Sequence, residues 1–207
     1  MGTDMKLLQK KIKVDTIILW IVCILFAVSI VSNIEKIIEY SQMNNSSFEV
    51  KLSPTDTVNN TENYYLYIDG EQNYPVDYNH YGRLDETGNT NVKANSIMDH
   101  VNGIVKSIII ESIFILLYTM LSQVKNGLTP FSVKSVSILR KVAILSFLLA
   151  LLPAVVTIAG SMLTFQYITV SFSSLNFYIL SIGVVFGIIS EIFKYGCELQ
   201  EDMNQIA

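Results

Sequence analysis

One carboxylate, Glu111, lies inside an apolar stretch from Gly103 to Val124 and is the residue of this chain best suited to proton or ligand chemistry. In a helix it shares one stripe with other polar side chains at helical spacing: Ser107, Glu111, Tyr118 and Ser122. An ionisable group in a membrane helix is costly in free energy and usually faces other helices or a water-filled cavity. Glu111 is therefore either a proton- or ligand-sensing site or a structural group hydrogen-bonded by Tyr and Ser side chains. The lack of a cation on the same helix face favours the structural role.

Two glycines one helical turn apart, Gly183 and Gly187, occur in an apolar stretch near the C-terminal end. Small residues at this spacing allow the backbone of a second helix to approach closely. We expect this pair to pack against another helix of the same chain. Homodimer formation through the same face is the alternative.

The last residues, 191–207, are polar and mostly acidic. If they continue as a helix, Tyr195, Leu199 and Met203 follow one another at i, i+4 and i+8 and form an apolar stripe beside carboxylates. This pattern predicts a surface that binds a soluble partner. The residues predicted to form it are Tyr195, Glu198, Leu199, Gln200, Glu201 and Asp202. A frayed, solvated terminus is the alternative.

Enzyme signatures are missing from the sequence, which has no His-Glu-x-x-His pair, no Gly-x-Ser-x-Gly elbow and no phosphate-binding Gly-Lys-Ser/Thr loop. The two histidines, His80 and His100, are expected to be ordinary surface residues. The two cysteines, Cys23 and Cys197, are isolated and offer neither a disulfide framework nor a metal site. We therefore expect no enzyme activity, no catalytic residue, no cofactor and no metal.

Residues 77–88 resemble an EF-hand calcium loop in part, with oxygen ligands at positions 1, 3 and 9 and a glycine at position 6. The pattern fails where calcium affinity is decided. Tyr81 occupies position 5, and Gly88 stands where a bidentate glutamate is required. Calcium binding is therefore not expected.

The 49 residues from Val142 to Ser190 contain no Asp, Glu, Lys or Arg. Pro153 and Gly160 are expected to break this run into two apolar blocks of about 20 residues, the length that crosses a hydrocarbon core of about 30 Å. Apolar residues make up 51% of the chain and charged residues 15%, which is typical of membrane proteins. With so few charges, direct binding of nucleic acid is not expected.

The sequence predicts an all-α integral membrane protein with four transmembrane helices, at 16–34, 103–124, 142–160 and 174–193. The remaining segments are a basic N-terminus (1–15), a long acidic segment rich in Tyr and Asn (35–102), a basic loop (125–141), a short outer loop (161–173) and an acidic tail (194–207).

The long segment between the first two helices has the patterns of a small β-rich lobe. Residues 48–52 alternate as in a strand, and the apolar run at 64–68 leads into Asp69-Gly70, a strong hairpin turn signal. The Asn-, Asp- and Gly-rich run from Pro75 to Asn95 is expected to be loop. Partial disorder of the lobe is the alternative.

Charge asymmetry predicts the orientation in the membrane. Lys and Arg gather before the first helix and between the second and third, whereas the segment from Glu35 to Val105 has eleven acidic and four basic residues. By the positive-inside rule both termini face the cytoplasm and the acidic lobe is extracytoplasmic. Four crossings satisfy this rule in every loop.

Three features give the chain a resemblance to a known family: the long outer segment, the Pro130-Phe131-Ser132 entry into a basic helix start ending in Leu139-Arg140-Lys141, and the closing run from Glu191 to Glu201. With these features the chain resembles the DUF2975 family of small bacterial four-helix membrane proteins. The resemblance implies a bacterial cell membrane and no established activity. It also implies a partner, because such proteins are often encoded beside a small helix-turn-helix regulator of the Cro/CI type.

We therefore expect a non-enzymatic regulatory or sensory protein of the bacterial plasma membrane, whose partners are the lipid bilayer and a cytoplasmic transcription regulator. The alternatives are a small transport or bacteriocin-immunity protein, or an accessory subunit of a membrane complex.

Overall fold

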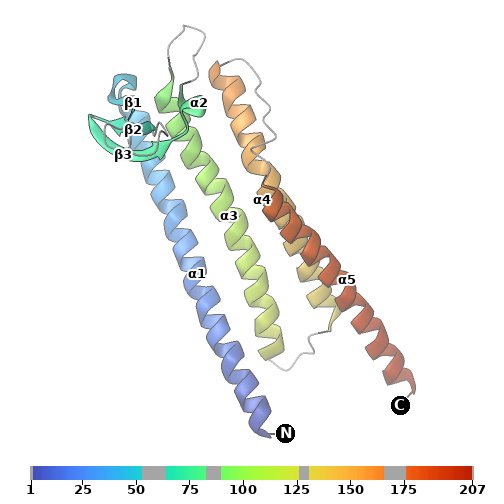
Figure 1. Cartoon of the computed structure of the whole chain (residues 1–207). Coiled ribbons are helices and arrows are strands. Elements are labelled where there is room, and N and C mark those ends of the chain that lie inside the picture. The colour runs from blue at the N-terminus through green and yellow to red at the C-terminus, as the bar shows by residue number, and fades with distance from the viewer. Residues whose placement is uncertain (1, 53–63, 83–89, 126–130, 166–175, 207) are drawn as a thin grey trace. The chain divides into compact units, whose positions relative to one another are not determined.

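The computed structural model describes residues 2–52, 64–82, 90–125, 131–165 and 176–206, and the side chains at 11–52, 64–78, 80–82, 90–125, 131–162 and 176–205. Four helices in this part of the chain are long and apolar enough to cross a membrane: α1 (Gly2–Gln42), α3 (Val92–Lys125), α4 (Val133–Phe165) and α5 (Phe177–Ile206) (Figure 1). This confirms the prediction of four helices of membrane-spanning length.

The chain forms two compact units. The helical unit comprises Met1–Ile30, Val105–Ala154 and Phe172–Ala207, and the sheet unit comprises Val31–Ile104 and Val155–Ser171. Three of the long helices contribute residues to both units.

The helices are longer than the apolar blocks that predicted them. α1 has 41 residues and is therefore ~60 Å long, about twice the thickness of a hydrocarbon core. Apolarity marks only the part of a helix that lipid must surround, whereas Lys, Glu and Gln are good helix formers and extend it into water. The predicted outer loop at 161–173 lies outside the described residues except for 161–165, which belong to α4.

The expected break at Pro153 and Gly160 is absent, because α4 continues through both residues to Phe165. Proline removes one backbone donor and crowds the preceding turn, but membrane helices tolerate it when neighbouring groups bind the freed carbonyl. At Gly160 a Cβ atom would lie 1.8 Å from Met98 Cε of α3, so the end of the Met98 side chain packs directly against this glycine and would have to move for a larger residue. Gly160 is a packing residue rather than a helix end.

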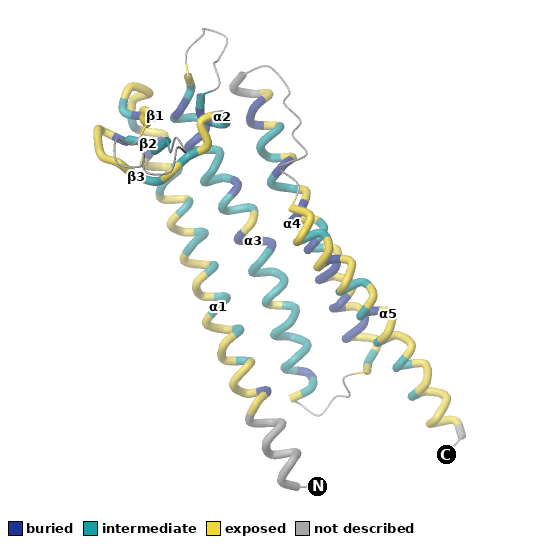
Figure 2. The backbone as a smooth tube through the Cα atoms, in the orientation of Figure 1, coloured by how far each residue is buried: buried dark blue, intermediate teal, exposed yellow. Residues whose placement is uncertain are grey.

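The buried residues of α4 include larger ones such as Leu139 and Val142 together with several small ones: Ser135, Ala143, Ser146, Ala150 and Ala154. Small residues on one face let other helices approach closely, which is how membrane helices gain packing energy. α1 is different, since its apolar side chains are largely exposed, including Trp20 and Leu25 at more than 60% (Figure 2). A run of exposed apolar side chains is unfavourable in water and fits a helix surrounded by lipid.

The sheet unit contains three antiparallel strands in the order β1-β2-β3: β1 (Phe48–Leu52), β2 (Tyr64–Ile68) and β3 (Glu71–Val76). A short 3₁₀ helix, η1 (Asn45–Ser47), precedes β1. Asp69 and Gly70 join β2 to β3 with φ values of 50° and 83°, the positive angles that a two-residue hairpin turn requires. The two predicted strands and their turn are therefore confirmed, and the lobe is β-rich where it is described.

The sequence predicts a loop from Pro75 to Asn95, and this prediction is wrong near both ends of the segment, at 75–82 and 90–95. A short helix, α2 (Tyr78–Tyr81), follows β3, and α3 begins at Val92. The Asn91 side chain caps α3 by accepting a hydrogen bond from the Ala94 backbone N–H at 3.1 Å. Polar composition suggested loop, but the start of α3 buries Val92 in the core of the strands and also buries the polar side chains of Asn95 and Ser96.

The core of the sheet unit is built from aromatic and aliphatic residues of the strands and of α1, α2 and α3: Tyr40, Phe48, Leu66, Ile68, Tyr81 and Val92. Lys93 fixes the C-terminal end of α1 to this core. Its Nζ donates hydrogen bonds to the carbonyl oxygens of Ser41 at 3.0 Å and Met43 at 2.6 Å. A cation at the C-terminal end of a helix also interacts favourably with the helix dipole.

Candidate functional site

The predicted partner-binding tail is helical, because α5 continues without a break to Ile206. Its apolar stripe is exposed: Tyr195 is 62% accessible, Leu199 47% and Met203 70%. Carboxylates accompany the stripe along the same stretch of helix, since Glu198, Glu201 and Asp202 are all exposed. Gln200, which the sequence placed in the same surface, is half-buried. The tail thus presents apolar and acidic groups together.

Phe131 packs against the same stretch of α5, beside the stripe. The Phe131 ring lies 5.0 Å from the Phe193 ring, centroid to centroid. A Cβ atom on Gly196 would lie 2.6 Å from Phe131 Cδ1, so a larger residue at 196 would displace the ring. These contacts hold one face of the helix and leave the stripe of Tyr195, Leu199 and Met203 uncovered by the described residues.

The start of α4 supports the same arrangement. Ser132 caps the helix, its Oγ accepting a hydrogen bond from the Ser135 N–H at 3.1 Å. Farther along, Arg140 Nη2 donates to Glu191 Oε1 of α5 at 2.7 Å. Two of the three features that carry the family resemblance, the helix start around 131–141 and the run 191–201, are therefore in contact. No sequence pattern indicates the Phe131–Gly196 contact, apart from a lone glycine within a helix.

The polar stripe on α3 does not form one connected network. Ser107 is buried and lies 3.4 Å from Ser29 of α1, hydroxyl to hydroxyl. Glu111 is half-buried, and no hydrogen bond or ion pair joins it to any described residue. Tyr118 and Ser122 are also half-buried, and no hydrogen bond links either to Glu111 within the described residues. The stripe thus pairs with α1 through Ser107, and Glu111 is not held in the way expected of a structural carboxylate.

The two glycines of α5 have different surroundings. Gly183 is buried, and a Cβ atom there would lie 3.3 Å from both the Ala143 carbonyl oxygen and Ser146 Cβ. At Gly187 an added Cβ would meet no described atom within 4 Å. Gly183 therefore packs against α4 of the same chain, as expected, and Gly187 does not share that contact.

The sheet unit contains a polar network that no sequence pattern predicted. The Tyr81 hydroxyl donates a hydrogen bond to Asp99 Oδ2, and His80 Nε2 lies 3.4 Å from Asp99 Oδ1. The Tyr74 and Tyr81 hydroxyls are 3.4 Å apart. Burial raises the pKa of Tyr81, and the neighbouring Asp99 charge raises it further, so the hydroxyl keeps its proton. This network ties α2 and β3 to α3.

The expectation that both histidines are ordinary surface residues is wrong. His80 belongs to the Asp99 network, and His100 Nδ1 lies 2.9 Å from Asn33 Oδ1 of α1. The His100 ring also meets the Tyr40 ring edge-on, with centroids 5.2 Å apart. Both imidazoles are half-buried. No sequence pattern indicates this, because the partners are 19 to 67 residues away along the chain.

Replacing Tyr81 by phenylalanine is expected to lower the free energy of unfolding by about 2 kcal/mol, because the half-buried Asp99 carboxylate loses a donor. Thermal unfolding of the purified protein, followed by circular dichroism, measures the change. Tyr67→Phe is the matched control, since its hydroxyl contacts Gln72 on an exposed face and its loss should cost at most about 0.5 kcal/mol. Equal destabilisation by the two variants would contradict the assignment.

Among the described residues, no group of three His, Cys, Asp or Glu side chains could hold a metal ion. Residues 83–88 of the calcium-loop pattern lie outside the described residues.

The fold fits a multi-pass membrane protein with four long apolar helices and a small three-stranded sheet. Comparisons of the chain with protein-family models, with curated proteins and with solved structures find no match. The resemblance to the DUF2975 family stays a prediction that rests on its motifs.

Proposed function

We propose that this chain is a non-enzymatic regulatory or sensory membrane protein whose C-terminal helix binds a soluble cytoplasmic partner. The observation that carries the proposal is the exposed apolar stripe of Tyr195, Leu199 and Met203 on a continuous helix. The carboxylates beside the stripe would lie in water, where an uncovered apolar stripe is unfavourable. A partner that covers it would remove that cost.

The chemistry of the stripe indicates the kind of partner. An amphipathic helix typically lays its apolar face into a hydrophobic groove of another protein, with anchors spaced at i, i+4 and i+8. The acidic residues Glu198, Glu201 and Asp202 favour a groove with a basic rim. A helix-turn-helix transcription regulator meets this description, since a nucleic-acid-binding protein carries basic surface. Sequestering such a regulator at the membrane would couple the outer lobe to gene expression.

The proposal requires the tail and the basic N-terminus to face the cytoplasm of a bacterial cell and the sheet unit to face outward. Single cysteines at Asn73 in β3 and Lys134 in α4, both exposed, test this in a background without Cys23 and Cys197. A membrane-impermeant maleimide applied to intact cells is expected to label position 73 and to spare position 134 until the cells are lysed. Labelling of position 134 alone in intact cells would show that the protein has the opposite orientation and would contradict the proposal.

Partner binding is tested by replacing Leu199 with glutamate in the full-length protein. A charge in the middle of the stripe should reduce recovery of the neighbouring helix-turn-helix regulator with the detergent-extracted protein by at least about tenfold, a change of about 1.4 kcal/mol. The fold should persist, because Leu199 is exposed. Gln205→Glu adds the same charge at another exposed position of the same helix and should leave recovery unchanged.

Deletion of residues 195–207 tests directly whether the C-terminal stripe binds the regulator. It removes the whole stripe and keeps Phe193, which contacts Phe131. Undiminished recovery of the regulator with this shortened chain would refute the proposed function.

A further inference from the structure

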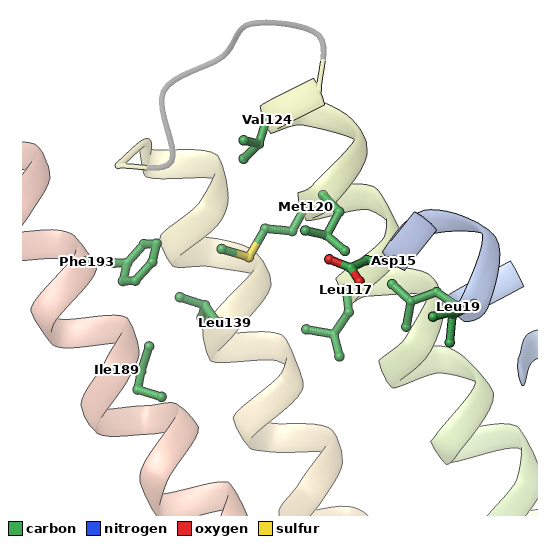
Figure 3. A pocket seen from close by; sticks show the side chains of 10 residues that line it. Asp15, Leu19, Leu117, Met120, Val124, Leu139, Ile189 and Phe193 are labelled. Atoms are coloured by element: carbon green, nitrogen blue, oxygen red, sulfur yellow. The ribbon is translucent and has the colours of Figure 1, made fainter. Parts of the chain in front are cut away.

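The helical unit contains a cavity of about 540 Å³, within the size range of small-molecule sites. All four long helices contribute to it: ten residues line it, and nine of them are apolar. Figure 3 shows Leu117 and Met120 of α3 on one side, with Ile189 and Phe193 of α5 across the cavity. Such a lining suits an apolar ligand or the apolar part of a larger one.

The remaining lining residue is Asp15 of α1, which lies beside Leu117 and Met120 in Figure 3. None of the ion pairs formed by the described residues includes Asp15. Asp15 is itself exposed, as are Lys11, one turn earlier on α1, and Lys13. Of these three charged residues, Asp15 is the one that lines the cavity, and a charge beside apolar groups is screened less on that side than a charge surrounded by water.

From this pairing of one carboxylate with an apolar lining we propose that the cavity is a binding site for a lipophilic monovalent cation, such as a quaternary ammonium or phosphonium ion. The cationic centre lies against the Asp15 carboxylate, and the apolar groups lie along Leu117, Met120, Ile189 and Phe193. Charge complementarity selects this occupant, because a carboxylate repels an anionic amphiphile and gives a neutral one no charge contact. The site is separate from the partner-binding tail, and its test does not depend on the tail.

The test uses the full-length protein in phosphatidylcholine nanodiscs with radiolabelled tetraphenylphosphonium as the probe, and empty nanodiscs to subtract partition into lipid. Saturable binding is expected, with an affinity at least about tenfold weaker in Asp15→Asn and retained in Asp15→Glu. Leu117→Trp should abolish binding by filling the cavity. Asp202→Asn, which removes one negative charge from the exposed tail, should bind like the unmodified protein.

Competition separates the cation site from a cavity that only accepts hydrocarbon chains. Dodecyltrimethylammonium should displace the probe, and dodecyl sulfate, which has the same chain with an anionic head, should not. Equal displacement by both would overturn the proposal and assign the cavity to lipid tails. Binding that is unchanged in Asp15→Asn, or not saturable at all, would also overturn it. Circular dichroism of each variant shows whether the helices have formed.

Discussion

Replacing Gly183 by leucine is expected to lower the free energy of unfolding in detergent by about 3 kcal/mol. A Cβ atom at this position would already lie 3.3 Å from the Ala143 carbonyl oxygen and from Ser146 Cβ. The rest of a leucine side chain would have to push α5 away from α4, and packed helices accommodate added volume poorly. Thermal unfolding of the purified protein, followed by circular dichroism, measures the loss.

Gly187→Leu is the control built into the same helix. It makes the same substitution one turn later, where an added Cβ meets no described atom within 4 Å. Removing a helical glycine should by itself help stability by up to about 1 kcal/mol. The contact between α4 and α5 at Gly183 would be refuted if both variants were destabilised alike. If Gly187→Leu disrupted a dimer seen by light scattering, the homodimer alternative would gain support for that position.

Replacing Leu66 by alanine is expected to destabilise the sheet unit by about 3 kcal/mol, since Leu66 is fully buried at the centre of its core. The side chain comes from β2, the middle strand, so the cavity left behind has strands on both sides. We expect faster cleavage of the region 43–91 by a protease added to purified protein, together with a lower unfolding temperature.

Leu52→Ala provides the comparison, because Leu52 ends β1 of the same sheet and is 45% exposed. Its loss should cost less than about 1 kcal/mol and leave the cleavage rate nearly unchanged. Identical cleavage rates for the two alanine variants would mean that the strands do not enclose a core at Leu66.

The features that depend on local pattern could be predicted from the amino-acid order alone. Long apolar blocks predicted four helices of membrane-spanning length, because lipid leaves a backbone few other ways to satisfy its hydrogen bonds. Alternating residues followed by Asp69-Gly70 predicted two strands and their turn, because the turn needs positive φ angles that few residues adopt. The i, i+4, i+8 spacing of Tyr195, Leu199 and Met203 predicted the stripe that α5 carries.

Contacts between residues far apart in the chain became known from the three-dimensional fold. The contacts of Asp99 with His80 and Tyr81, and of Phe131 with Gly196, join positions 18 to 65 residues apart, and no local period encodes such pairs. α4 also passes through Pro153, where the sequence had predicted a break. The cavity at Asp15 has the same origin, because four helices must pack before one carboxylate faces nine apolar side chains.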